Sequence, residues 1–460
     1  MQSAASPLRE GAIGADVATI AARLERLPVT GYQRGLFLII ATAWFFDSVD
    51  LASLTFVLGS IRAEFGLSTA QAGLLSSASF AGMLVGATLA GLAADRYGRT
   101  LVFQTSMILW GVGGVAAGLS NRVTTLGACR FLLGLGMGME FPVAQSLVSE
   151  IIPAQLRGRY LALLEGFWPI GFIAAGLLAR TILPVGGWRQ VFIIGAVPAL
   201  FVFVIRRVVP ESPRWLASRG RMAEADRIVR RFESAVKTQT GAAQLPDPPQ
   251  VYAVESGGRS SLADLWSARY RRRTVMLWLL WFFALLGYYG LTTWLGALLQ
   301  DAGYSLTQSV SYTTLISLAG IPGFFASAWL IEAWGRKPTC ILTLVGAAVA
   351  SWFYGTAPNE NALIGWGLAL QFFQFGMWSV LYAYTPELYP TRSRATGTGC
   401  ASAVGRLGSL VGPYVVGLVL PTVGQAGVFA LGAGAFLIAA ASVAALGIET
   451  RGRTLEAISG

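Results

Sequence analysis

Residues 91–99 read Gly-Leu-Ala-Ala-Asp-Arg-Tyr-Gly-Arg, and residues 328–336 read Ala-Trp-Leu-Ile-Glu-Ala-Trp-Gly-Arg. Each stretch follows a long apolar segment and carries an acid, a glycine and an arginine at the same spacing. The two stretches are 237 positions apart, as Arg336 is from Arg99. Further pairs keep this offset: Glu150 with Glu387, Pro153 with Pro390, Arg157 with Arg394, and Trp44 with Trp281. A fixed offset over half of a chain indicates an internal duplication, which we interpret as two similar halves inserted in parallel in a membrane.

The composition is typical of a membrane protein. Of 460 residues, 54% are hydrophobic and only 12% are charged, against roughly 25% charged in soluble domains. A spanning helix needs about 20 apolar residues. Twelve segments meet that need: 35–59, 72–94, 101–120, 124–148, 160–183, 188–207, 274–299, 309–331, 338–356, 362–385, 397–420 and 425–447. We therefore predict an all-α membrane protein with twelve transmembrane helices in two pseudo-symmetric six-helix bundles.

These segments divide the chain into five parts. We predict a cytoplasmic N-terminal segment over 1–34, an N-terminal bundle over 35–208, a cytoplasmic helical linker over 209–273, a C-terminal bundle over 274–447 and a cytoplasmic tail over 448–460. Within the first part, residues 16–27 place Val17, Ile20, Leu24 and Leu27 on one helical face. This amphipathic pattern predicts a helix that lies on the membrane surface.

The basic charge indicates topology. The chain holds 34 Lys and Arg and has a net charge of +11. Four arginines fall on one side of the predicted membrane, Arg62, Arg122, Arg180 and Arg189, and Arg130 and Arg406 lie inside segments, which leaves 28 of the 34 on the other side. This asymmetry predicts that both termini and the linker are cytoplasmic, in a bacterial-type inner membrane. The charge would attract anionic lipid as a secondary effect, and we expect no nucleic-acid partner.

Several chemistries are not supported. The chain has no histidine, and its three cysteines (Cys129, Cys340 and Cys400) form no motif, so we expect no metal site. No phosphate-binding glycine loop with its lysine is present, which argues against ATP use. We expect no cofactor, no enzymatic activity and a monomer.

Four strings carry a family resemblance: residues 91–99 with their repeat, Pro210 to Leu216 (Pro-Glu-Ser-Pro-Arg-Trp-Leu), Pro386 to Pro390 with Arg394, and Glu449 to Glu456. Together they resemble the sugar-porter-related branch of the major facilitator superfamily. Within that branch the chain is most similar to bacterial nicotinate and aromatic-acid carriers and to synaptic-vesicle-type relatives. The resemblance implies alternating access, with gating residues in the loop motifs: Asp95, Gly98, Arg99, Glu150, Arg157, Glu332, Gly335, Arg336, Glu387 and Arg394.

The same resemblance suggests a proton-coupling pair. Asp47 falls where proton-linked sugar porters place an aspartate that pairs with an arginine, here Arg130. A charge in mid-membrane is costly, about 2.5–3.5 kcal/mol on insertion scales, so the two must face each other or water. A static ion pair is the alternative. Asp50 shares the helix face of Asp47, or faces water near the outer mouth, and Glu140 is either a second proton site or a structural partner.

The candidate substrate residues combine one cation with aromatic rings. Arg406 stands alone in the eleventh segment, and its forked guanidinium suits a carboxylate; the alternative is that it pairs with Glu165 or Glu140. Glu165 stands where sugar porters carry a glutamine, which argues against ordinary sugar binding. Gln374, Trp378 and Tyr382 share a helical face and, with Phe46 and Tyr289, would form a slot for a planar ring; lipid-facing or packing roles are the alternative.

These residues favour a secondary active transporter that imports a small organic anion, nicotinate or a similar aromatic monocarboxylate, together with protons. A benzoate-type proton symporter is the near alternative. A sugar or drug transporter, an efflux carrier and a non-transporting membrane sensor are the others. Two retained gate motifs argue against a sensor.

Overall fold

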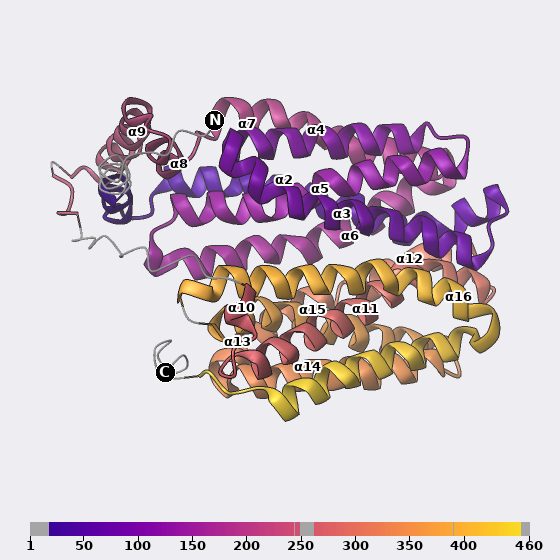
Figure 1. The fold of residues 1–460 in the computed structure, drawn as a ribbon. Coiled ribbons are helices and arrows are strands. Elements are labelled where there is room, and N and C mark those ends of the chain that lie inside the picture. Colours follow the sequence, from indigo (N-terminus) through magenta and orange to yellow (C-terminus); the bar gives the residue numbers. More distant parts are fainter. Residues whose placement is uncertain (1–17, 243, 249–261, 390, 452–460) are drawn as a thin grey trace.

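The structure is a computed structural model that describes residues 18–242, 244–248, 262–389 and 391–451. The described residues form two helical bundles that lie side by side, one indigo to magenta and one orange to yellow (Figure 1). The N-terminal bundle contains α2 (Gly31–Phe65), α3 (Thr69–Tyr97), α4 (Arg99–Gly118), α5 (Val123–Ile151), α6 (Ala154–Ala196), η1 (Val197–Phe201) and α7 (Val202–Val208). The C-terminal bundle contains α11 (Arg271–Asp301), α12 (Leu306–Ser317), α13 (Gly320–Trp334), α14 (Arg336–Gly355), α15 (Glu360–Glu387) and α16 (Thr391–Leu446).

The described helices supply twelve membrane crossings. Nine helical stretches are long and apolar enough to cross, and two of them, Ala154–Val208 and Thr396–Leu446, are long enough to cross twice. With α15, whose 28 residues are long enough for one more crossing, the total is twelve. The all-α, twelve-helix prediction is confirmed.

The duplication extends to the helix breaks and helix starts. The long helices α6 and α16 bend at Gly187 (φ 69°) and Gly424 (φ 63°), which are again 237 positions apart. Positive φ is accessible to glycine at little cost, so each hairpin turns there. The helices α3 and α12 begin with the same capping box, formed by Ser68 with Gln71 and by Ser305 with Gln308, which satisfies backbone N–H groups at the first turn.

The two bundles are closed against each other at the end opposite the linker. A Cβ on Gly73 would lie 2.6 Å from the carbonyl oxygen of Pro413, and one on Gly417 would lie 2.4 Å from that of Thr69. Only glycine permits this approach of α3 and α16. An ion pair between Arg62 and Asp301, at 2.7 Å, joins the ends of α2 and α11. No ion pair found within the described ranges joins the bundles at the linker end.

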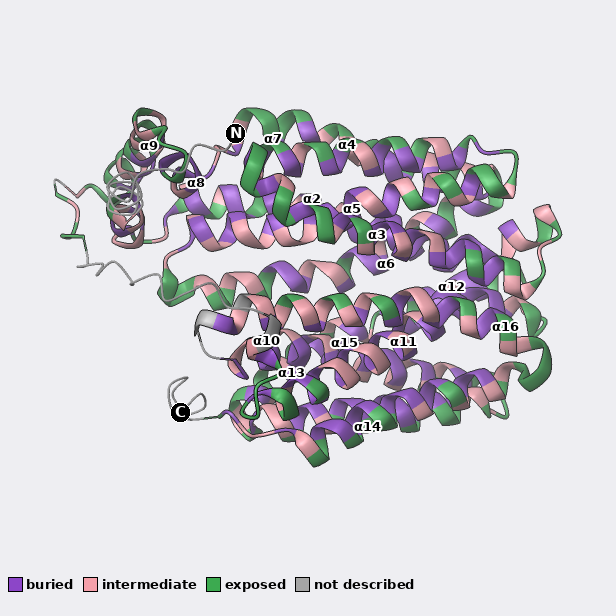
Figure 2. Cartoon of the chain, viewed as in Figure 1, coloured by how far each residue is buried: buried purple, intermediate pink, exposed green. Residues whose placement is uncertain are grey.

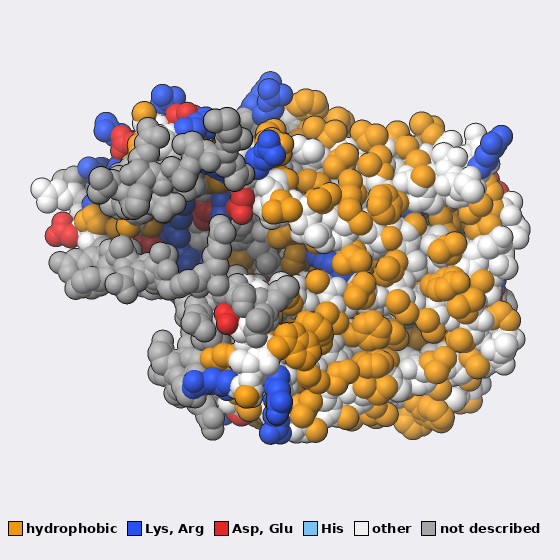
Figure 3. Space-filling view, in the orientation of Figure 1, with side chains coloured by type: hydrophobic (Ala, Val, Ile, Leu, Met, Phe, Trp, Pro, Cys, Tyr) orange, Lys and Arg blue, Asp and Glu red, His pale blue; other side chains and the backbone are white. Residues whose placement is uncertain are grey.

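The surface agrees with this arrangement. Figure 3 shows apolar side chains over most of the face in view, whereas charged side chains gather mainly at the linker end. The contacts between the bundles therefore close the molecule at the end far from the linker.

The linker forms a small helical layer at one end of the N-terminal bundle. It contains α8 (Pro213–Ser218) and α9 (Met222–Thr240), whereas the short α10 (Leu262–Leu265) lies against the C-terminal bundle (Figure 1). One face of α9 is buried and the opposite face is exposed (Figure 2). Its buried side chains, which include Val229 and Phe232, are joined by Trp215 of α8 in one apolar cluster.

The prediction of an N-terminal helix on the membrane surface is wrong. Residues 18–25 are helical, but Ile20, Leu24 and Leu27 are buried in the cluster formed by α8 and α9. Val17 and residue 16 lie outside the described residues. The physical reason is that α9 is itself amphipathic, so the two apolar faces cover each other and need no lipid.

Ion pairs hold this segment in place. Arg23 pairs with Asp226 and Glu233 at 2.6 and 2.8 Å. Glu25 accepts hydrogen bonds from Arg157, Arg214 and the backbone N–H of Ala154. Since Arg157 lies in the first turn of α6, Glu25 links the N-terminal segment, the linker and the bundle.

Glu25→Gln should destabilise the protein at neutral pH. Burial acts to raise the pKa of the Glu25 carboxyl, but the Ala154 N–H, Arg214 and Arg157 outweigh it and hold the pKa below its usual value. Because the pKa of Glu25 is lower in the folded state than in the unfolded state, the stabilisation is present above pH 4.5, the unfolded-state pKa. It is lost as the pH falls through the folded-state pKa. Thermal melts in detergent should therefore show a loss of about 1 kcal/mol at pH 7 that shrinks below pH 4.5.

The matched control is Glu224→Gln. Glu224 is exposed, and its one ion pair among the described residues is with its near neighbour Arg221, so this variant should melt like the wild type. Equal melting of the Glu25→Gln variant and the wild type at pH 7 would contradict the linking role.

Candidate transport site

A central cavity lies between the two bundles. Both halves contribute to its wall. The N-terminal bundle supplies Trp44, Asp47, Phe80, Met83, Met137, Phe141, Glu165, Trp168 and Pro169. The C-terminal bundle supplies Trp281, Leu285, Tyr289, Phe324, Phe375, Trp378, Tyr382, Ser402, Arg406 and Ser409.

Four pairs of wall positions keep the offset of the duplication. Offsets of 237 relate Trp44 to Trp281 and Phe141 to Trp378, so equivalent positions carry aromatic rings in both halves. The same offset relates Glu165 to Ser402 and Pro169 to Arg406. Neither of these two charges has a charged equivalent in the other half. The two halves therefore both contribute aromatic rings at equivalent positions of the wall, but they differ in the charged side chains that they contribute.

Arg406 faces the cavity without a carboxylate partner. Its guanidinium carbon lies 5.3 Å from the centre of the Phe141 ring, a cation–π contact across the two halves. In the part of the chain that the structure describes, Arg406 forms no ion pair, and the alternative pairing with Glu165 or Glu140 is not observed. Arg406 is partly exposed to the cavity. A cation inside the membrane without an opposite charge is costly, so this position favours an anionic ligand.

Three of the predicted aromatic residues surround the same space. Trp378 and Tyr382 stack with ring centroids 5.6 Å apart and an interplanar angle of 21°. Tyr289 meets Trp378 edge-on at 6.1 Å, and Phe141 approaches Tyr382 at 5.9 Å. Rings in these geometries attract one another and can accept a further planar ring.

Two residues of the predicted slot do not line the cavity. Gln374 is fully buried, and its Oε1 accepts a hydrogen bond from Thr292 of α11 at 3.4 Å. Phe46 packs on Phe45 and on the N-terminal bundle. The reason is that Gln374, one turn before Trp378, turns toward α11, while the wall of α2 is formed by Trp44 and Asp47 instead.

The predicted pairing of Asp47 with Arg130 is also wrong. The carboxylate beside Arg130 belongs to Asp50, at 3.9 Å, and both side chains are fully buried. Asp50 therefore does not face water at the outer mouth. Arg130 also donates from Nε to the Ser79 hydroxyl at 2.9 Å. The two acids are three positions apart, so they point in directions about 60° apart around the helix axis: Asp50 points into the bundle and Asp47 toward the cavity.

Asp47 and Glu140 differ in their surroundings. Asp47 lines the cavity, and its Oδ1 is buried without a hydrogen-bond partner. Glu140 is buried away from the cavity, where Oε2 accepts from the Trp110 indole at 3.1 Å and the Ser106 hydroxyl at 3.4 Å. Of the two predicted roles for Glu140, this geometry fits the structural one.

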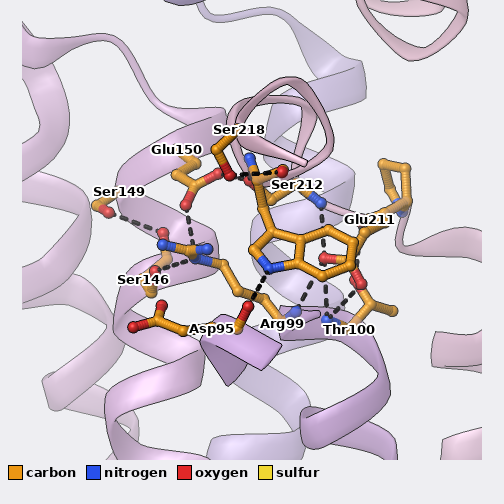
Figure 4. Close-up of polar contacts among 11 residues, drawn as sticks. Asp95, Arg99, Thr100, Ser146, Ser149, Glu150, Glu211, Ser212 and Ser218 are labelled. Atoms are coloured by element: carbon orange, nitrogen blue, oxygen red, sulfur yellow. Dashed lines mark hydrogen bonds and ion pairs between the residues drawn. The ribbon is translucent and has the colours of Figure 1, made fainter. Parts of the chain in front are cut away.

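The first loop motif forms a polar cluster at the linker end (Figure 4). Arg99 pairs with Glu150 at 2.7 Å and donates to Ser146. Glu211 accepts hydrogen bonds from the backbone N–H groups of Arg99 and Thr100, so a carboxylate caps the positive end of α4.

Side chains that follow the sixth crossing complete this cluster. Ser212 donates to Glu150, and the Trp215 indole donates to the backbone carbonyl of Asp95 at 2.8 Å. Asp95 is itself exposed. The loop between α3 and α4 is thereby fixed to the linker.

The second motif forms the same cluster in the C-terminal bundle. Arg336 pairs with Glu387 at 3.0 Å and with Glu332 at 3.1 Å. Glu449 caps the start of α14 through the N–H groups of Arg336 and Lys337. Thr450 donates to Glu387. The turns at Gly98 and Gly335 have φ of 104° and 110°.

Sequence reasoning missed the capping acids. Glu211 and Glu449 are 238 positions apart, one more than the repeat, as are Ser212 and Thr450. Allowing one insertion in the repeat would have found them. Arg157 forms an ion pair with Glu25, whereas Arg394 donates a hydrogen bond to the carbonyl of Pro386 at 3.1 Å. These two equivalent arginines therefore make different contacts.

Two pseudo-symmetric six-helix bundles, one cavity between them and a charged cluster at the base of each define a transporter of the major facilitator class. The family described as "Sugar (and other) transporter" matches residues 31–460, and the chain belongs to it.

Similar proteins include the niacin transporter NiaP of Acinetobacter baylyi, 39% identical over 95% of this chain and 99% of that protein. The 4-hydroxybenzoate transporter PcaK of Pseudomonas aeruginosa is 28% identical over 86% of this chain and 88% of that protein. Among solved structures, the inward open xylose transporter XylE of E. coli shares the fold, with a TM-score of 0.73 at 19% identity over 93% of this chain and 99% of that one. The protein is thus a multi-pass membrane transporter of a small molecule and not an enzyme.

Proposed function

We propose that this transporter imports nicotinate or a similar aromatic monocarboxylate together with protons. The observation that carries the proposal is Arg406, an unpaired cation that faces an aromatic cavity. A guanidinium binds a carboxylate through two parallel hydrogen bonds. The stacked Trp378 and Tyr382 offer a face to a planar ring. Two relatives are named as transporters of niacin and of 4-hydroxybenzoate, which supports the same substrate class.

The cavity suits a sugar less well. Apart from tyrosine hydroxyls and indole N–H groups, its wall holds few polar side chains, namely Asp47, Glu165, Ser402, Arg406 and Ser409. A hydroxyl-rich ligand would leave several groups without hydrogen bonds against the indole and phenyl rings, and each such group costs free energy. A flat ring with one charged group matches the wall better.

The substrate class can be tested with the purified protein. Thermal shifts should be large with nicotinate, smaller with benzoate and 4-hydroxybenzoate, and near zero with nicotinamide and xylose. Nicotinamide has the same ring and shape but no charge for Arg406 to neutralise. A shift with nicotinamide equal to that with nicotinate would contradict the carboxylate as the recognised group.

The orientation completes the proposal. The linker end carries most of the charged side chains in view (Figure 3), and the rule that basic residues stay inside places this end, with both termini, in the cytoplasm of a bacterial-type inner membrane. The cavity then opens inward. We propose that the protein acts as a monomer, since each chain encloses its own cavity.

Trp378→Ala should weaken nicotinate binding by about 1–2 kcal/mol through lost ring contact and apolar burial. Isothermal titration in detergent measures this. Trp352→Ala is the matched control, because Trp352 is 52% exposed on α14 and does not line the cavity. If both variants bind like the wild type, the ring of the substrate lies elsewhere.

A further inference from the structure

We infer that Glu165 selects substrates that carry a proton-sharing ring nitrogen in addition to the carboxylate bound by Arg406. This inference rests on the proposed function and deepens it. Glu165 and Arg406 are two of the three charges that break the duplication of the cavity wall, where their equivalents are Ser402 and Pro169; the third is Asp47, whose equivalent is Ala284. An acid from one half and a base from the other fit a ligand with two unlike ends.

Glu165 is held ready for a ligand. It is buried, with 7% of its surface exposed, and the side-chain amide of Gln145 donates to its Oε1 at 3.0 Å. Across the ranges that the structure describes, no cation pairs with Glu165 and no hydrogen bond reaches its Oε2. Gln145 therefore orients the carboxyl group and leaves one oxygen for a partner in the cavity.

The two charges share one space but do not meet. Tyr289 and Tyr382 line the same cavity as Glu165 and Arg406. No ion pair joins the two. Glu165 comes from α6 and Arg406 from α16, so a ligand that contacts both bridges the bundles.

The repeat also gives their relative depth. Glu165 is four residues before Pro169, and Pro169 is equivalent to Arg406. Equivalent positions of parallel repeats lie at similar depth, so Glu165 lies about one helical turn, about 5.4 Å, closer to the linker end than Arg406. That offset suits a single six-membered ring with a polar atom at each end. Trp378 and Tyr382 can then stack on the ring between them.

The chemistry of the contact is a shared proton. A carboxyl group and a pyridine-type nitrogen form one hydrogen bond with one proton between them, whichever atom holds it. Benzoate has C–H at the ring position and leaves the Glu165 oxygen unpaired in a closed site, which is costly. Recognition by Glu165 therefore separates N-heteroaromatic acids from carbocyclic ones of the same shape.

The test compares nicotinate with benzoate on the purified full-length protein. In the wild type, titration calorimetry should show nicotinate binding about 10- to 100-fold more tightly than benzoate. In Glu165→Leu the ratio should fall to about threefold or less, with benzoate binding retained. Glu165→Ser, which installs the residue of the equivalent position, should do the same if the leucine variant fails to fold. Glu140→Gln, a buried acid outside the cavity, should keep the wild-type ratio.

Each outcome is decisive. Equal affinity of the wild type for both acids overturns the inference, and so does an unchanged ratio in the Glu165 variants. If Glu165 were only a counter-charge for Arg406, its removal would change the two affinities equally and leave the ratio unchanged. A wild type that binds neither acid refutes the proposed function itself.

Discussion

Arg406→Ala should abolish detectable binding of nicotinate and benzoate while the protein still folds. Removing one partner of a desolvated charge pair costs about 2–5 kcal/mol, which is about 30-fold to several thousand-fold in affinity. Arg406→Lys should recover only part of this loss, because an ammonium group lacks the planar fork that holds both carboxylate oxygens. Titration calorimetry of the purified variants measures the loss.

The folded state of the Arg406→Ala variant is expected to survive. Arg406 has no carboxylate partner among the described residues, so its removal leaves no opposite charge unpaired and removes a desolvated cation. The ligand-free variant should melt no lower than the wild type. Arg180→Ala, at an exposed arginine of α6, is the control and should bind normally. Wild-type affinity in Arg406→Ala would exclude Arg406 as the carboxylate site.

The fold could be predicted from the sequence because it rests on long-range regularities. Twelve apolar stretches set the number of crossings, and one offset of 237 sets the relation of the halves. Even the breaks at Gly187 and Gly424 obey this offset. The N-terminal segment was predicted wrongly because an amphipathic pattern shows that one face must be covered and does not show by what. Here α9 covers it.

The site could be predicted only in part. Arg406 and Trp378 were found because a lone cation and a helical aromatic stripe are local signals. The partner of Arg130 was assigned wrongly because Asp47 and Asp50 are separated by nearly one turn, and small rotations of α2 decide which of them points inward. Phe141 was missed, although its offset from Trp378 is that of the repeat. Comparing the halves position by position would have identified it.

The contacts at the two ends of the molecule differ in whether they join the bundles. At the linker end, Arg99 with Glu150 and Arg336 with Glu387 form clusters within each bundle and leave the bundles free to separate. At the far end, the contact of Arg62 with Asp301 and the close approach of α3 and α16 join the bundles. Alternating access requires the far contacts to open when the linker end closes. The cavity residues stay between these two ends throughout.

Asp47 is the acid that we expect to couple a proton to this movement. It lines the cavity, and its Oδ1 is buried without a hydrogen-bond partner. A carboxylate in the membrane without a cation or donors must bind a proton or face water. Asp50 by contrast stays beside Arg130, where loss of the acid would leave a buried cation unpaired, at about 3–5 kcal/mol.

Asp47→Asn should therefore lose accumulation of nicotinate driven by an inward proton gradient yet retain counterflow, since exchange needs no net proton movement. Proteoliposomes measure both activities on one preparation. Asp50→Asn is the comparison, and its expected defect is a lower melting temperature. If Asp47→Asn accumulates nicotinate as the wild type does, Asp47 is not the coupling site. If Asp50→Asn instead loses accumulation but keeps counterflow, the proton binds at the pair of Asp50 with Arg130. A wild type whose uptake ignores the proton gradient would refute symport and leave facilitated diffusion of the same anion.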